Sequence, residues 1–339
     1  KGRSLDPEQE ARLQRPTEFG QCFEADNIIA SKQQVGVDEA RTSLHIRDHY
    51  SGALGEYAAK SRNFNNNVKA MKHFGGRRCI GTSAFCKCDD ADEVKDAAEH
   101  LGWIPSPSLP REWPHNTHCE RDIGISKDLA GAAFETSGFP DYAWPIILEY
   151  IAQARTFFSD APIYPYEIGT PHEEAKKGKS RYEVATGHPF TGVEYPIGAL
   201  VNYRKKASVP GGSRSVPGIF AGWRLEPGLV HRGVVRIIDL EGIKTGKKEL
   251  FRPLDYRADE VIFPAVADLT FPLRNAKDRS IKLGSDFWQE LVGDSSPSGA
   301  VEDREQEPAS REDDQEDDLT ERFRKIVVAG DKANRRNAP

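Results

Sequence analysis

The chain has 339 residues, of which 37% are hydrophobic and 29% are charged. This length predicts about two domains with connecting segments, and 16 Phe, 10 Tyr and 5 Trp supply material for a core. No run of about 18 apolar residues predicts a membrane-spanning helix, and no N-terminal segment is typical of a signal peptide. The five cysteines are odd in number and irregularly spaced, which argues against a disulfide framework and favours a reducing compartment. Met71 is the only methionine, so we expect a piece of a longer product.

Charge is distributed unevenly along the chain, although the net charge is only -6. Residues 302–321 hold eleven acids and two arginines, whereas residues 171–252 hold fifteen Lys or Arg and eight acids. A basic segment followed by an acidic tail predicts a polyanionic partner, or a tail that competes for the same basic surface.

The first half of the chain alternates strand and helix patterns. Residues 1–18 are polar and predict a disordered lead-in, and a strand is expected near residues 23–29. The Ser51-Gly52 turn between two short runs predicts a hairpin, so the first three strands should form an antiparallel meander. A helix over 63–74, a fourth strand ending near Cys88 and a helix over 89–101 follow, whereas the proline-rich stretch 105–115 predicts a loop.

Two long helices, expected over about 117–136 and 141–158, complete a mixed α/β domain at 19–160. Residues 161–180 are rich in Pro, Lys and Glu and predict a linker. Short β-rich runs over 181–275 predict a small basic β-barrel. The Ser-, Pro- and acid-rich residues 290–339 predict a disordered acidic tail.

Three acidic residues occupy positions that folding alone does not explain. Asp26 lies within a strand pattern, Asp89 ends a strand, and Glu120 begins a helix. Strand ends and an adjacent helix can converge in a mixed sheet, and three converging carboxylates repel one another unless cations neutralise them. Mg²⁺ is the usual hard cation for such oxygen ligands, and paired ions serve in-line phosphoryl displacement. The plain alternative is that all three are solvated surface acids.

Residues 19–275 resemble the integrase of long-terminal-repeat retrotransposons, especially the Copia-like kind. FEADNII resembles the strand of the first acid, HIRDHYSGALGEYAAKS the next two strands, and CDDADEV the segment of the second acid. PHNTHCERDIGISKDLAGAAFETSGFPDYAWP resembles the helix of the third acid, 31 residues after the second. SRYEVATGHPF and GIFAGWRLEPG resemble segments that lead into the family's C-terminal domain. In this chain Asp90, His118-Cys119 and Asp122 depart from the family pattern.

The resemblance implies a ribonuclease H-like catalytic core followed by an SH3-like, DNA-binding barrel. It implies an enzyme that processes DNA 3′ ends and transfers strands, with Asp26, Asp89 and Glu120 holding two Mg²⁺ ions, or Mn²⁺ in their place. DNA is the implied partner, and a homo-oligomer is expected to bind it. No membrane partner is implied. The implied function would place the protein in the nucleus. Apart from that function, a cytoplasmic location is expected, and secretion is not. DNA contacts are expected from Lys127, Arg204, Lys205, Lys206 and Arg224, with Arg232 among further basic residues of the barrel.

Several alternatives stay open at this point. Asp48 rivals Asp26 as the first acid, because it is also acidic at a strand end. One alternative function is a ribonuclease H-type nuclease, which has the same core and does not need the barrel. Another is a co-opted element that binds nucleic acid without catalysis. Cys86, Cys88, His118 and Cys119 lack the paired spacing of a zinc site.

Overall fold

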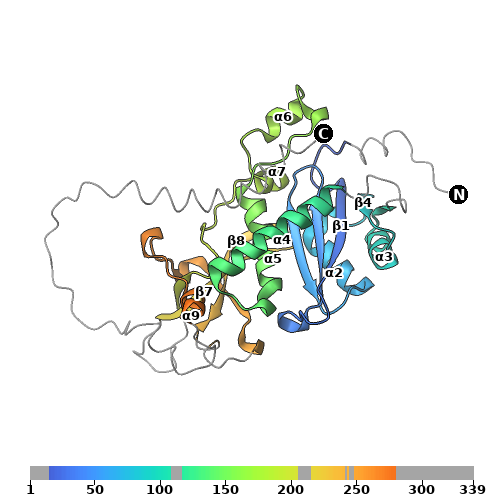
Figure 1. Ribbon diagram of the computed structural model, residues 1–339. Coiled ribbons are helices and arrows are strands. Elements are labelled where there is room, and N and C mark those ends of the chain that lie inside the picture. The colour runs from blue at the N-terminus through green and yellow to red at the C-terminus, as the bar shows by residue number, and fades with distance from the viewer. Residues whose placement is uncertain (1–14, 108–116, 205–214, 241–242, 244–247, 280–339) are drawn as a thin grey trace, which may run out of the picture.

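The computed structural model describes residues 15–107, 117–204, 215–240, 243 and 248–279. Two five-stranded sheets lie on either side of a pair of long helices (Figure 1). The predicted lead-in and the predicted acidic tail fall largely or wholly outside the described residues. Within the described residues no helix is long and apolar enough to cross a membrane.

The first sheet is mixed, as predicted, and has the order β3-β2-β1-β4-β5. Its strands are β1 (Cys22–Ile29), β2 (Thr42–Asp48), β3 (Leu54–Ala59), β4 (Phe85–Cys88) and β5 (Ile104–Pro107). The first three are antiparallel and the last two pair in parallel beyond β1, which makes β1 the central strand. The sequence missed β5, since its residues IPSP look like loop. Pro is tolerated at this position because β5 is an edge strand.

One face of this sheet is apolar and is covered by α2 (Phe64–Gly75) and α3 (Asp92–His100). Phe23 of β1 stacks on Trp103 at a ring distance of 4.4 Å and meets Phe74 of α2 edge to face at 5.8 Å. Asn63 caps α2 by accepting a hydrogen bond from the Asn66 backbone N–H.

The opposite face of the sheet is covered by α4 (Thr117–Ser137) and α5 (Trp144–Phe158), which pack on each other (Figure 1). A 3₁₀ turn at Asp141–Ala143 precedes α5, so the α-helix begins three residues later than predicted. Pro145 occupies the first turn of α5, where its missing N–H costs no hydrogen bond. Because α5 contacts both β3 and β7, it is buried nearly all round, as its apolar sequence predicts.

Residues 161–180, expected as a linker, form an ordered segment that includes α6 (Pro171–Lys176). Lys176 and Glu167 are both buried and form an ion pair at 2.5 Å. The Lys176 ammonium also lies 4.0 Å from the centre of the Tyr50 ring. The polar composition that suggested a linker therefore belongs to a segment whose charges are paired inside the protein. Next comes α7 (Arg181–Thr186).

The second sheet is antiparallel and has the order β10-β6-β7-β8-β9. Its elements, with the helix that follows them, are β6 (Leu200–Arg204), β7 (Ser215–Glu226), β8 (Val230–Asp239), β9 (Pro253–Arg257), β10 (Val261–Ile262) and α9 (Pro272–Asp278). Trp223 of β7 is fully buried and stacks on Tyr150 of α5 at 5.3 Å. The two sheets thus share one apolar core through α5.

Candidate active site

Strand register gathers polar side chains on the face of the first sheet beneath α4. Asp26 pairs with His45, and Glu24 pairs with Arg47 across β1 and β2. On the other side of β1, Glu24 pairs with Lys87 of β4. Because side chains alternate along a strand, these residues share one face, while Phe23 and Ala25 point into the apolar layer on the other.

The three acids singled out from the sequence lie around this polar face. Asp26 is half-buried in β1, Asp89 is exposed directly after β4, and Glu120 is exposed in the first turn of α4. Asp89 follows Lys87 by two residues, as Asp26 follows Glu24, so both acids lie toward the same end of the parallel pair β1 and β4. Asp89 and Glu120 lie near enough to Asp26 to act on its charge, so the three acids share one region around the end of β1, the end of β4 and the start of α4.

Both Asp89 and Glu120 act electrostatically on Asp26. Its pKa is raised above the usual value, first by burial and then by the negative charges of Asp89 and Glu120. The Asn27 backbone N–H donates a 2.7 Å hydrogen bond to the Asp26 carboxylate and, with the charge of His45, opposes this rise.

The donor set suits a hard divalent cation. All three side chains offer carboxylate oxygens, and a cation placed among them would relieve the repulsion that raises the Asp26 pKa. Two of the three are exposed, so a cation has a path from solvent. The donor chemistry therefore suits Mg²⁺ or Mn²⁺. Among the described residues, however, ligand atoms of three such side chains come within 4.8 Å of one another at Glu24, His49 and His118, and not at these three acids.

Asp48, the rival for the first acid, has a structural role. It pairs with Phe23 in the β1–β2 ladder, so its side chain lies on the face opposite Asp26. Its buried carboxylate accepts hydrogen bonds from the backbone N–H groups of Gly20 and Ser51, at 2.9 and 2.7 Å, and from the Ser51 hydroxyl. These contacts hold the turn between β2 and β3.

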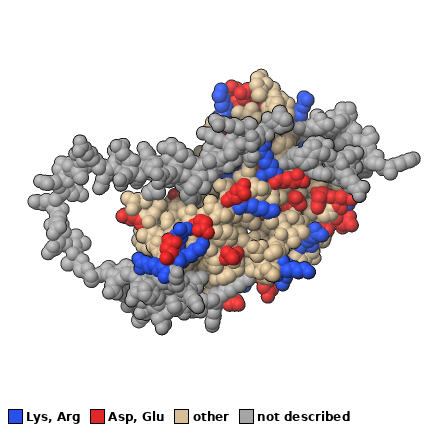
Figure 2. All heavy atoms as spheres, viewed as in Figure 1, with Lys and Arg blue, Asp and Glu red and all other residues tan. Residues whose placement is uncertain are grey.

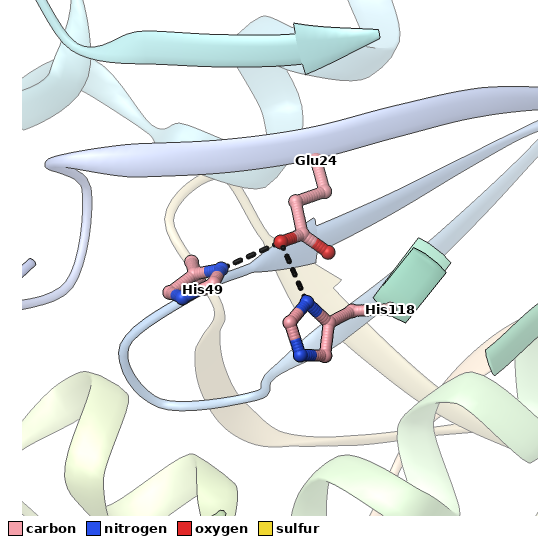
Figure 3. Close-up of side chains that lie close together, drawn as sticks. All are labelled: Glu24, His49 and His118. Atoms are coloured by element: carbon pink, nitrogen blue, oxygen red, sulfur yellow. Dashed lines mark hydrogen bonds and ion pairs between the residues drawn. The ribbon is translucent and has the colours of Figure 1, made fainter. Parts of the chain in front are cut away.

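A second polar cluster, Glu24, His49 and His118, lies on the same face as Asp26 (Figure 3). Glu24 Oε1 is 2.5 Å from His49 Nδ1 and 3.4 Å from His118 Nδ1. Burial alone would raise the Glu24 pKa, but the two histidines and Arg47 lower it well below its usual range. Sequence reasoning missed this cluster. Its only signal was the alternation that puts Glu24 on the face of Asp26.

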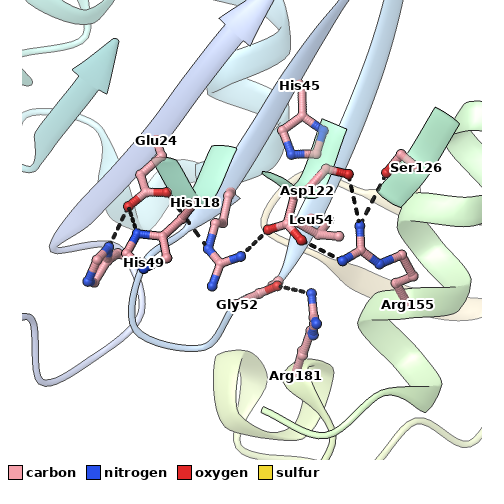
Figure 4. Close-up of polar contacts among 12 residues, drawn as sticks. Glu24, His45, His49, Gly52, Leu54, His118, Asp122, Ser126, Arg155 and Arg181 are labelled. Carbon is pink, nitrogen blue, oxygen red and sulfur yellow. Dashed lines mark hydrogen bonds and ion pairs between the residues drawn. The ribbon is translucent and has the colours of Figure 1, made fainter. Parts of the chain in front are cut away.

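Ion pairs in the protein interior fix α4 over the sheet (Figure 4). Asp122, two residues after Glu120, contacts Arg47 of β2 and accepts a 2.5 Å hydrogen bond from Arg155 of α5. Arg155 also donates to the Ser126 hydroxyl at 3.2 Å. Asp122, one of the departures from the family pattern, is thus the residue that ties α4 to both neighbouring elements.

The residues expected to contact DNA differ in their surroundings. Lys127 is exposed on α4, and Arg204 is exposed at the end of β6. Arg224 is exposed, but it forms an ion pair with Asp255 at 3.2 Å. Lys205 and Lys206 lie outside the described residues.

Other arginines of the second sheet are also paired, among them Arg236 with Glu149 and Arg257 with Asp259. Figure 2 accordingly shows basic and acidic side chains side by side on the face in view. Counting Lys and Arg against Asp and Glu over 171–252 therefore overestimates how much positive charge is available to a ligand in the described part of this region.

All five cysteines are reduced and buried. Cys86 pairs with Phe23 in the β1–β4 ladder, which places it on the apolar face of the sheet. His118 instead faces Glu24 and His49 on the polar face. Cys86 and His118 therefore lie on opposite faces of the sheet.

No family model matches this chain, and no curated protein matches it. Among solved structures, a chain of the simian T-cell lymphotropic virus intasome in complex with the PP2A regulatory subunit B56 gamma is 13% identical, with a TM-score of 0.37 over 74% of this chain and 80% of that one. The HTLV-2 integrase catalytic core domain in complex with magnesium is 14% identical, with a TM-score of 0.32 over 50% of this chain and 98% of that one. The catalytic core domain of BIV integrase is 14% identical, with a TM-score of 0.29 over 44% of this chain and 93% of that one. Likenesses of this size establish neither family nor function.

Proposed function

We propose that this chain is an integrase-type polynucleotidyl transferase that processes DNA 3′ ends and joins them to target DNA. One observation carries the proposal: the pKa of Asp26, on the central strand, is raised by burial and by the negative charges of Asp89, which follows β4, and of Glu120 on α4. The ordered resemblance to Copia-like integrases over residues 19–275 supports it, since the same three acids match that pattern. The ribonuclease H-like reading of the core rests on the same evidence.

The chemistry follows from the donor set. Asp26, Asp89 and Glu120 would hold two Mg²⁺ ions, which activate the attacking hydroxyl and neutralise the leaving oxygen when bound. The chain itself supplies the fixed carboxylates and their orientation. Asp26 is held by the Asn27 backbone N–H, and Glu120 is held by the anchoring of α4 through Asp122. No nucleophilic side chain is needed, so no covalent enzyme intermediate forms.

DNA binding is assigned to exposed basic side chains around these three acids and on the second sheet. Lys127 lies on the helix of Glu120, seven residues further on, which is nearly two turns along the same face. Arg204 extends the surface to β6, which we propose belongs to an SH3-like module. The proposed partners are element ends and target DNA, bound by a homo-oligomer in the nucleus.

The test is a joining assay with a labelled double-stranded DNA end in Mg²⁺ or Mn²⁺. Asp26→Asn, Asp89→Asn and Glu120→Gln should each abolish joining, because an amide is a poorer ligand for a hard cation. Asp128→Asn, an exposed acid on α4, is the matched control and should keep the parent rate. Asp48→Asn should lower stability and keep the metal dependence.

The outcomes separate the alternatives. Cation-dependent cleavage without joining would replace the proposal with a nuclease. DNA binding with neither reaction, at any cation concentration, would make the chain a nucleic-acid-binding protein. Retention of bound Mn²⁺ in all three acid variants, measured by electron paramagnetic resonance, would show that these acids do not hold the metal.

A further inference from the structure

The Glu24, His49 and His118 cluster brings together three ligand groups from separate elements. Glu24 comes from β1, His49 follows the last residue of β2, and His118 lies in the first turn of α4. One ligand atom from each lies within 4.8 Å of the other two. Residues that are far apart in the sequence have thus been brought to the spacing of a metal centre.

We propose that this cluster is a binding site for a single transition-metal ion of the zinc class, distinct from the carboxylate site of Asp26, Asp89 and Glu120. Two imidazole nitrogens and one carboxylate oxygen are a common ligand set for Zn²⁺, whereas Mg²⁺ prefers oxygen ligands alone. The site goes beyond the proposed strand transfer and does not depend on it.

The distances suit such an ion. Neighbouring ligand atoms on a tetrahedral ion with bonds of about 2.0–2.1 Å lie roughly 3.3 Å apart. Glu24 Oε1 and His118 Nδ1 are already separated by 3.4 Å. His49 Nδ1, at 2.5 Å from the same oxygen, needs to move by less than about 1 Å to admit the ion.

One atom of the cluster lacks a hydrogen-bond partner. The Glu24 side chain is 1% exposed, and its Oε2 accepts no hydrogen bond among the described residues. Buried carboxylate oxygens are rarely left without a donor, so Oε2 is available as a second ligand atom of Glu24 beside Oε1. His118 is 43% exposed, and the cluster is open to solvent on that side. An ion can enter there, and a water molecule can complete its coordination.

Neighbouring groups hold the ligands in place. The Tyr164 ring stacks on His49 at 4.9 Å with an interplanar angle of 9°, and its hydroxyl donates a 2.8 Å hydrogen bond to the His49 carbonyl. Arg47 donates in turn to the Tyr164 hydroxyl at 2.9 Å. Such outer contacts orient a histidine ligand before the metal arrives.

Two cations oppose metal binding. Arg47 Nε and Lys87 Nζ each lie 3.9 Å from a Glu24 oxygen. Lys87 is 26% exposed, whereas Arg47 is buried and also contacts Asp122. The imidazoles bind a metal through nitrogen lone pairs as neutral groups, so the repulsion weakens the site without removing its ligands.

The test uses the full chain and Zn²⁺ alone, in competition with a chromophoric chelator. The parent should bind one Zn²⁺ that His118→Gln and His49→Gln weaken more than about tenfold. Added Zn²⁺ should raise the melting temperature of the parent and leave that of His118→Gln unchanged. His188→Gln, another exposed histidine, and Asp26→Asn should bind Zn²⁺ like the parent.

Several results would overturn the proposal. One is a His118→Gln variant that binds Zn²⁺ within twofold of the parent. Another is loss of Zn²⁺ binding in Asp26→Asn, which would place the ion at the carboxylate site. Cobalt substitution checks the ligands: bound Co²⁺ should show tetrahedral visible absorption without a sulfur-to-metal band, and such a band would assign the ion to the cysteines. None of these readouts depends on strand transfer.

Discussion

Asp122 of α4 accepts a 2.5 Å hydrogen bond from Arg155 of α5, inside the protein. The side chains are 5% and 1% exposed, and Arg47 of β2 reaches the same carboxylate from the other side. Burial alone would raise the Asp122 pKa, but the two guanidinium groups hold it well below its usual range. Since Glu120 precedes Asp122 by two residues, this pair fixes the helix that carries the third acid.

Arg155→Met should destabilise the protein by about 3 kcal/mol, since breaking one partner of a buried ion pair costs about 3–5 kcal/mol and Arg47 remains to compensate in part. The measurement is the free energy of unfolding from urea titrations. Arg274→Met, which breaks an exposed ion pair with Glu135, is the control. Its free energy of unfolding should equal that of the parent. Equal unfolding midpoints for the parent and Arg155→Met would mean that the pair does not anchor α4.

Arg204 and Arg232 are exposed on the second sheet and form no ion pair with another described residue. If they contact DNA phosphates, Arg204→Gln and Arg232→Gln should each reduce the slope of log affinity against log salt by about 0.9. Arg257→Gln, whose guanidinium already pairs with Asp259, should change the slope less. A salt titration of DNA binding checks this, and parent-like slopes in both variants would assign the affinity elsewhere.

His73 of α2 joins the two sheets. Its ring nitrogens lie 3.1 Å from the Tyr57 hydroxyl and 3.2 Å from the Leu225 carbonyl of β7. Burial lowers the His73 pKa below its ordinary value of 6.5, and the hydrogen bond to Leu225 partly opposes this. As pH falls below 6.5, the unfolded chain takes up the proton first, so stability is lost between that pH and the lower folded-state pKa.

His73→Gln should therefore flatten the decline in unfolding free energy below pH 6.5. Above that pH the imidazole is neutral in both states and contributes no pH dependence. Urea unfolding at a series of pH values provides the measurement, with His188→Gln as the exposed control. An unchanged pH profile in His73→Gln would show that other groups carry the effect.

A further prediction concerns the acidic residues 302–321 and rests on their charge alone. Deleting residues 294–339 should tighten DNA binding at about 0.01 M salt, where the Debye length is about 30 Å. At about 0.15 M salt, screening should bring the two affinities together. Equal affinities at the lower salt would leave the tail without a competitive role.

The sequence by itself determined the mixed α/β character of the first half, its hairpin and the long helices, because side-chain periodicity and turn residues are local properties. It also pointed to Asp26, Asp89 and Glu120, through spacing and the family resemblance. It missed β5, because edge strands tolerate the prolines that usually indicate a loop. It also read 161–180 as a linker, since charges that pair in the interior look like solvated charges in a sequence.

Only the tertiary structure decided which polar residues meet. Strand register put Glu24 on the face of Asp26 and Asp48 on the opposite one, although all three are acids in β-strands. The packing of α4 then brought His118 to Glu24 and His49. Such contacts join residues up to 94 positions apart and depend on register and helix placement, which no local pattern contains. The histidine cluster was therefore beyond the reach of the sequence.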